Sequence, residues 1–320
     1  MNKVEKILTI IASSLLVVGL IVFITVMAVR GFDFSGLSTV KYEVKTHEVT
    51  EEYANIKVDI TYADLTIVKG EEATTKALCY ESDRLTYTLE VEDDTLVITD
   101  THKMRRFWTI FDLWGNKGVT LYVPNNAYTN LLVNNETGSL TVANSVTFNK
   151  ITARLETGSI TLNGDANVID VSSETGSITL NNVDADSAKL VTETGKTFLN
   201  NVNVTGDITI SADTGAAKLT DVKSDNLTID AETVTITLTD TVITNTMNLE
   251  TETGSINFVK SDAHDIYART STGSINGSLL TGKIFSAHSK NGTVSVPSNT
   301  AGAGVCDLRT NTGNITITIG

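Results

Sequence analysis

The chain has 320 residues, of which 41% are hydrophobic, and it carries a formal net charge of −14 at pH 7. This acidity excludes a general nucleic-acid binder, because neutralising a phosphate backbone needs a basic surface. Proline occurs only twice, and the chain is rich in Thr, Asn, Val and Ile rather than in strong helix formers. Such a composition favours an all-β body.

The first element is an uncharged apolar segment over residues 7–29, bounded by Lys6 and Arg30. At about 1.5 Å per residue, a helix of this length crosses a hydrocarbon core of ~30 Å. The alternative is a cleaved signal peptide, whose apolar region is shorter and ends in a small-residue cleavage site. We therefore expect a retained single-pass anchor in the cell membrane, with residues 1–6 as a cytoplasmic tail and the bulk of the chain extracytoplasmic.

A juxtamembrane linker is expected over residues 30–46, and short alternating segments predict N-terminal β strands over 47–130. An insertion at 103–116 interrupts these strands with apolar residues at helical spacing. Three roles are open for it: a cap over the end of the β structure, a membrane contact, or a partner site. Its candidate contact residues are Phe107, Trp108, Phe111 and Trp114.

Residues 131–320 repeat with a period of about nineteen residues, a spacing typical of stacked repeat proteins. One position, which we call the corner residue, is Gly in every repeat but one. Glycine there indicates a tight turn or a close approach of two backbone segments. The corner residues are Gly138, Gly158, Gly176, Gly195, Gly215, Val234, Gly254, Gly273, Gly292 and Gly313.

Apolar and polar residues alternate on both sides of each corner. In "ETGSITL", for example, Ile178 and Leu180 flank the polar Thr179. Positions two and four after the corner, and five and seven before it, are apolar with few exceptions, which predicts two strands per repeat with one face inward. Because one repeat cannot bury its own apolar row, we expect the repeats to stack as a parallel β-helix of about ten rungs over 131–320.

Seven of the residues two positions before the corner are acidic. The carboxylates could form a ladder for cations or for a cationic partner, or they could be a solvated edge column. Neighbours ~5 Å apart in water repel by about 1 kcal/mol, whereas each buried apolar side chain contributes ~1.5–3 kcal/mol, so the stack needs no bound ion. The acidic column consists of Glu136, Glu156, Glu174, Glu193, Asp213, Glu232 and Glu252.

The sequence contains no phosphate-binding loop, HExxH zinc motif or G-x-S-x-G nucleophile motif. Arg154, Arg269 and Arg309 share one outward column, but their sequence separation predicts that many rungs lie between them, too many to converge on one sugar. We therefore expect no enzyme and no cofactor or metal site. Cys306 falls on an inward column as a small buried hydrophobe, and a disulfide with Cys79 stays open.

The segments "ADLTIVKG", "LTYTLEVEDDTLVITD", "VTLYVPNN" and the "ETGSITL" repeats resemble the bacterial "putative adhesin" family. This is a β-strand-repeat domain of unknown function found behind single membrane anchors, especially in Gram-positive bacteria, and the resemblance covers about residues 40–320. It implies a right-handed β-helix at the cell envelope, and the family supplies no catalytic motif.

The resulting hypothesis is a non-enzymatic, membrane-anchored extracytoplasmic β-helix that acts as an adhesin-like binding or scaffolding module at the cell envelope. Its partner would be an envelope protein or a glycan. One alternative is a carbohydrate-active β-helix enzyme. Another is a self-assembling envelope-stress or sensing component, which would associate through an open strand edge at the C-terminal "NTGNITITIG".

Overall fold

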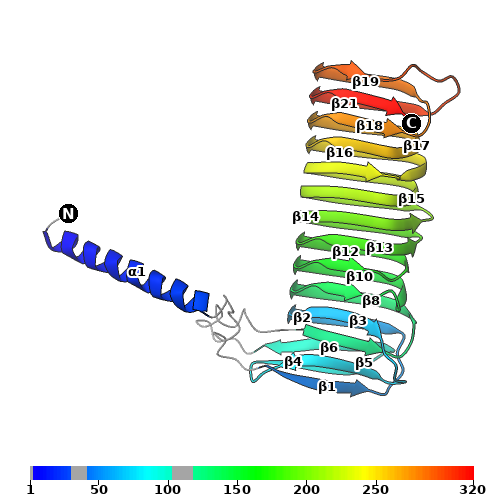
Figure 1. The fold of residues 1–320 in the computed structure, drawn as a ribbon. Helices are drawn as coiled ribbons and strands as arrows, with labels where there is room; N and C mark the ends of the chain where they lie inside the picture. Colours follow the sequence, from blue (N-terminus) through cyan, green and yellow to red (C-terminus); the bar gives the residue numbers. More distant parts are fainter. Residues whose placement is uncertain (1–2, 30–41, 103–117) are drawn as a thin grey trace.

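The computed structural model describes residues 3–29, 42–102 and 118–320. An N-terminal helix, α1 (Lys3–Val29), precedes an all-β body that forms one long stack of coils (Figure 1). The part of α1 over Ile11–Val29 is long and apolar enough to cross a membrane, with a mean hydropathy of 2.6, and only 6% of it is buried.

The central coils are built from strands that pair in parallel, each residue beside its counterpart in the next repeat. Ile151, for example, pairs with Leu131 on one side and with Ile169 on the other. The predicted all-β solenoid of about ten turns behind one apolar helix is thereby confirmed. Its central strands are β8 (Ala127–Thr137), β9 (Leu140–Val142), β10 (Thr147–Thr157), β11 (Ile160–Leu162), β12 (Ala166–Thr175), β13 (Ile178–Ala185), β14 (Ser187–Val204), β15 (Asp207–Thr239), β16 (Val242–Thr253), β17 (Ile256–Thr272) and β18 (Ile275–Leu279).

Most corners need glycine because the neighbouring coil passes very close. A Cβ atom added to Gly176, whose φ is +158°, would lie 2.0 Å from the carbonyl oxygen of Gly158. The same carbonyl accepts a hydrogen bond of 2.8 Å from the Oγ of Ser173, three residues before the corner. Val234 shows a second solution, because it occupies the corner without a positive φ and with its side chain buried.

A second stacked corner follows six residues after the first. The residues there adopt the left-handed conformation with φ between 48° and 52°, which Asn and Asp tolerate better than other non-glycine residues. A ladder of side-chain amides runs beside this corner: Asn200 donates to Asn181, and Asn181 to Asn163. The left-handed residues are Asn182, Asn201, Asp221, Asp240 and Lys260.

The predicted inward columns form one continuous core, in which most of these side chains are almost fully buried. An exception to their apolar character is Thr197, which is buried although its hydroxyl has no hydrogen-bond partner in the described structure. Cys79 and Cys306 are both buried and free, so the disulfide left open by the sequence is not formed. Burial raises the pKa of each thiol to about 12.

At the N-terminal end, the stacking extends to strands that precede the repeats. The coil of β2 and β3 pairs in parallel with β8 and β9 on one side and with β6 and β7 on the other. Antiparallel strands cover the outer edge, since β5 pairs with β6, β4 with β7, and β1 with β4. These strands are β1 (Glu43–Val49), β2 (Asn55–Tyr62), β3 (Asp64–Lys69), β4 (Thr75–Glu81), β5 (Leu85–Glu92), β6 (Thr95–His102) and β7 (Gly118–Val123).

The insertion predicted at 103–116 falls between β6 and β7, and it lies outside the described residues together with Phe107, Trp108, Phe111 and Trp114. Its role therefore stays a prediction. The domain division at residue 130 also stays a prediction, although parallel pairing crosses that position between β2 and β8.

At the C-terminal end, the order of coils differs from the order of repeats. The last strands in the chain, β21 (Val305–Thr312) and β22 (Ile315–Ile319), pair with β17 and β18 on one side. On the other side they pair with β19 (Ile284–Asn291) and β20 (Val294–Ser295). Figure 1 shows β21 in red between β17 and the outermost strand β19.

The position of β21 and β22, between the coil of β17 and β18 and the coil of β19 and β20, corrects one expectation: the repeats do not run in sequence order to the end of the stack. The segment "NTGNITITIG" covers the end of β21 and all of β22. β22 pairs with β18 on one side, and on the other side only Ile315 and Thr316 pair with β20. Self-association through this segment stays a prediction.

Candidate functional site

The candidate site is an outward face of the solenoid, which we call the charged face. It is formed by the residues two, four and six positions before each corner residue, together with their counterparts in β2. In the coil of Gly176 these are Asp170, Ser172 and Glu174. Because the coils stack in register, each position forms a column of side chains spaced by ~4.8 Å.

The structure brings the predicted acidic column together as one line of exposed carboxylates. Their strand neighbours pair in register, as Thr157 with Thr175 and Thr175 with Thr194. Among the described residues, no group of three or more His, Cys, Asp or Glu side chains is arranged to hold a metal ion. Whether cations or a partner use this column stays a prediction. Its members are Glu136, Glu156, Glu174, Glu193, Asp213, Glu232 and Glu252.

A shallow groove of about 360 Å³ lies beside the N-terminal part of this column. It is lined by Glu136, Glu156 and Glu174 and by Arg154. The Arg154 guanidinium is engaged by Asp170, at 2.8 Å from its carboxylate and 2.7 Å from its main-chain oxygen. The groove is therefore acidic, and its arginine is already bound within the face.

The C-terminal part of the charged face is basic. Arg309 pairs in register with Arg269 on one side and with His288 on the other. The sequence predicted that these arginines lie too far apart to act together, and for Arg269 and Arg309 this is wrong. The repeat of β19 and β20 lies between them in the chain but outside them in the stack.

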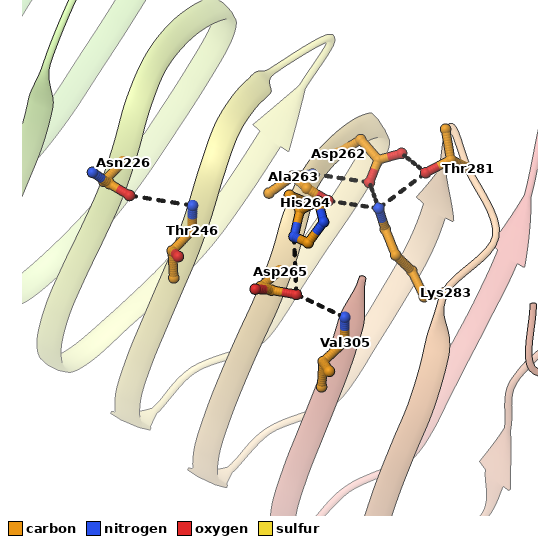
Figure 2. A network of polar contacts seen from close by, with 9 residues as sticks. All are labelled: Asn226, Thr246, Asp262, Ala263, His264, Asp265, Thr281, Lys283 and Val305. Carbon is orange, nitrogen blue, oxygen red and sulfur yellow. Dashed lines mark hydrogen bonds and ion pairs between the residues drawn. The ribbon is translucent and has the colours of Figure 1, made fainter. Parts of the chain in front are cut away.

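A buried group of polar side chains, which we call the polar clamp, lies where β21 enters between β17 and β19 (Figure 2). The Lys283 ammonium lies 2.8 Å from a carboxylate oxygen of Asp262, and both side chains are buried. Lys283 also donates to the Ala263 carbonyl (2.6 Å) and to the Thr281 hydroxyl (2.9 Å), while Thr281 donates to Asp262 (2.7 Å). These bonds offset the desolvation cost of a buried ion pair.

The polar clamp spans the inserted coil. Lys283 directly precedes β19 and bonds Asp262 and Ala263 within β17. Gly304 and Val305 lie between these two strands, since Gly304 approaches His264 and Val305 pairs with Ile284. The Val305 amide donates to Asp265 at 2.8 Å, and this bond holds the pKa of Asp265 below its usual range. A Cβ on Gly304 would lie 1.8 Å from the His264 oxygen, so this approach requires glycine.

Sequence reasoning missed this basic part of the charged face and the polar clamp. Arg269, Arg309 and His288 belong to repeats that look alike, and periodicity carries no information about the order in which equal repeats stack. One signal was present: an irregular stretch with Pro297 and two glycines, Gly302 and Gly304, follows Val294, as a connection that passes over a coil requires.

The fold and the face define a class: a parallel β-solenoid behind one long apolar helix, with charge sorted along one side. A family comparison gives the particular group, since residues 53–219 match the family described as Toastrack DUF4097. The chain belongs to this family, a domain of unknown function. This confirms the resemblance to a β-strand-repeat domain of unknown function, whereas the membrane anchor and the Gram-positive source stay predictions. No curated protein matches the chain.

A comparison with solved structures finds matches that extend over most of the chain. A "putative adhesin" from Parabacteroides distasonis is 11% identical, with a TM-score of 0.49, over 86% of this chain and 97% of that chain. A "putative adhesin" from Bacteroides fragilis is 13% identical, with a TM-score of 0.36, over 86% and 97%. A "putative lipid binding protein" from P. distasonis is 15% identical, with a TM-score of 0.33, over 73% and 96%. At these values the similarities carry no argument about function.

Proposed function

We propose that the protein is a membrane-anchored, extracytoplasmic binding or scaffolding module of the cell envelope and that it catalyses no reaction. The observation that carries the proposal is α1, whose Ile11–Val29 stretch is apolar and only 6% buried. A helix of 27 residues with this composition has no core to enter in the described protein, and a bilayer would cover it.

The solenoid suits binding because its side chains are held in fixed columns. Main-chain hydrogen bonds run between every pair of neighbouring coils, and the core is continuous from β2 to β22. Such a body presents a long, rigid surface without folding on contact, so little conformational entropy is lost when a partner binds. The charged face then gives that surface two chemically different parts.

The experiment is site-directed labelling in intact cells with a membrane-impermeant maleimide. The native Cys79 and Cys306 are buried and give no background in the folded protein. We expect Lys223→Cys, on the exposed surface of β15, to be labelled in intact cells. Asn2→Cys, on the other side of the helix, should be labelled only after permeabilisation.

The reversed pattern would place the solenoid in the cytoplasm and overturn the proposal. Release of the labelled protein into the medium without its N-terminal residues would show a cleaved signal peptide and overturn the anchor.

A further inference from the structure

The basic end of the charged face is formed by three neighbouring coils whose order in space is not their order in the chain. Arg269 of β17, Arg309 of β21 and His288 of β19 follow one another in one column. Lys290 lies two residues after His288 and points to the same outward side. Since neighbouring strands are ~4.8 Å apart, one ligand group can touch several of these side chains. We call these four residues the basic cluster.

The charges of the basic cluster are only partly neutralised. Arg309 contacts Asp307 of its own strand, with Nε–Oδ1 and Nη2–Oδ2 distances of 3.0 and 2.9 Å. Within the described part of the chain, Arg269 and Lys290 have no hydrogen-bond or ion-pair partner. Arginines stacked ~5 Å apart in water repel by about 1 kcal/mol, and a bound anion would remove this repulsion.

Arg154 provides an internal comparison, because it occupies the same column near the other end of the face. There the guanidinium is held by Asp170 of the next coil. The acidic column ends at Glu252, and its next positions in the stack are Ser271, Asn311 and Lys290. The sign of the face therefore changes where Arg269 begins.

We propose that the basic cluster binds a phosphate group carried by an anionic polymer of the envelope. Arg269, Arg309 and Lys290 outnumber the two carboxylates beside them, Asp307 and Glu250, which pairs with Arg269. The net charge of about +1 balances the single negative charge that each phosphate inside such a polymer carries. The planar guanidinium forks of Arg269 and Arg309 match the oxygens of a phosphate. The acidic column repels the polymer on one side of the basic cluster. The bound polymer therefore extends in the other direction, past β19 and beyond the end of the solenoid.

This proposal deepens the proposed function by naming the class of ligand. It rests on that function only in assuming that the solenoid meets the ligand in the cell envelope. A phospholipid surface is a poorer occupant. The cluster lies at the opposite end of the solenoid from β1, the strand that follows α1 and its linker (Figure 1). About ten coils at ~4.8 Å separate the two ends by roughly 50 Å.

The test measures binding of a fluorescently labelled short inorganic polyphosphate to the full chain in neutral detergent micelles, by fluorescence anisotropy at fixed ionic strength. We expect Arg269→Ser to weaken binding about tenfold, and Arg269→Ser with Lys290→Ser to weaken it about a hundredfold. Both side chains are exposed and have no described partner, so the variants should fold. Arg154→Ser is the matched control, and its affinity should equal that of the unmodified protein.

The proposal is overturned by equal affinities of the unmodified protein and the Arg269→Ser variant, or by an equal loss in Arg154→Ser. It is also overturned if vesicles rich in phosphatidylglycerol bind through Arg269 and polyphosphate does not. None of these results depends on the orientation measured by maleimide labelling, so failure of the binding site and failure of the membrane topology are distinguishable.

Discussion

Arg269 and Arg309 lie side by side on neighbouring parallel strands although 40 residues separate them in the chain. The repeat between them, with β19 and β20, forms the outermost coil instead. The N-terminal end follows the same plan, because β2 and β3 lie inside β6 and β7. At both ends the first or last coil of the chain is held between two others, so fraying there requires breaking two strand interfaces rather than one.

Replacing Thr197 by valine should stabilise the protein. The hydroxyl of Thr197 is buried without a partner among the described residues, on a column where its neighbour is Ile178. Valine has nearly the same shape and removes the unsatisfied group, so we expect the free energy of unfolding to rise by about 1 kcal/mol. Denaturant unfolding measures it, with Thr179→Val on the outward side as a neutral control. A loss of stability would mean that the hydroxyl has a partner.

Replacing Gly176 by alanine should be strongly destabilising. The added Cβ would lie 2.0 Å from the Gly158 oxygen, and φ is +158°. We expect a loss of about 3 kcal/mol from strain and overpacking. Gly118→Ala is the control, because its Cβ would meet the Asp64 oxygen at an ordinary 3.5 Å. Similar melting temperatures for the two variants would contradict the close approach at the corner.

The contact of Glu81 with β1 should make stability depend on acid pH. Burial raises the pKa of Glu81, but bonds from Lys45, His47 and the Tyr87 amide outweigh it and hold the pKa below its usual range. A carboxylate whose pKa is lowered in the folded state stabilises the folded protein at pH values above its unfolded-state pKa of ~4.3. This stabilisation is lost as the pH falls through the folded-state pKa. Glu81→Gln should cost about 2 kcal/mol at pH 7 and progressively less below pH 4.

The matched control for Glu81 is Glu90→Gln, an exposed residue of β5 that lies opposite Val97. Its unfolding free energy should follow that of the unmodified protein at every pH. A constant difference between Glu81→Gln and the unmodified protein across the acid range would show that the carboxylate is not ionised through its contacts with Lys45 and His47.

Neutralising one carboxylate in the middle of the acidic column should stabilise the solenoid at low salt. Glu193 is exposed between Glu174 and Asp213, ~5 Å from each by strand spacing. Glu193→Gln should add about 0.5 kcal/mol at 10 mM NaCl and nothing measurable at 0.5 M, because salt screens exposed charges. Thermal unfolding in both buffers gives the comparison. Destabilisation by the variant at low salt would indicate that the column is neutralised by a bound cation.

Much of the fold follows from the alternation of apolar and polar residues, because a strand with one inward face has period two. That pattern places Ile178, Leu180 and Cys306 in the core and the acidic column outside. The order of the last coils cannot be read in this way, since β19 and β21 offer equivalent apolar rows to β17. Their order depends on tertiary features: the polar clamp at Lys283, the Asp265–Val305 bond and the close approach at Gly304.

The second corner could not be predicted from the alternation of apolar and polar residues either, although most residue types at that position suit its conformation. Asn182, Asn201 and Asp221 are residue types that accept a left-handed conformation, whereas Lys260 at the same position is held there by the stack. The basic cluster depends on the coil order alone, so it follows from no local motif.

The position of β21 between β17 and β19 is tested most directly by disulfide formation between engineered cysteines on exposed positions. Ser271 and Asn311 lie between the paired residues Thr270–Thr310 and Thr272–Thr312, at the ~4.8 Å spacing that a disulfide bridges. Ser271→Cys with Asn311→Cys should crosslink rapidly under mild oxidation, and Ser271→Cys with Lys290→Cys, two coils apart, should not. The opposite result would show that the coils stack in sequence order and would remove the basic cluster.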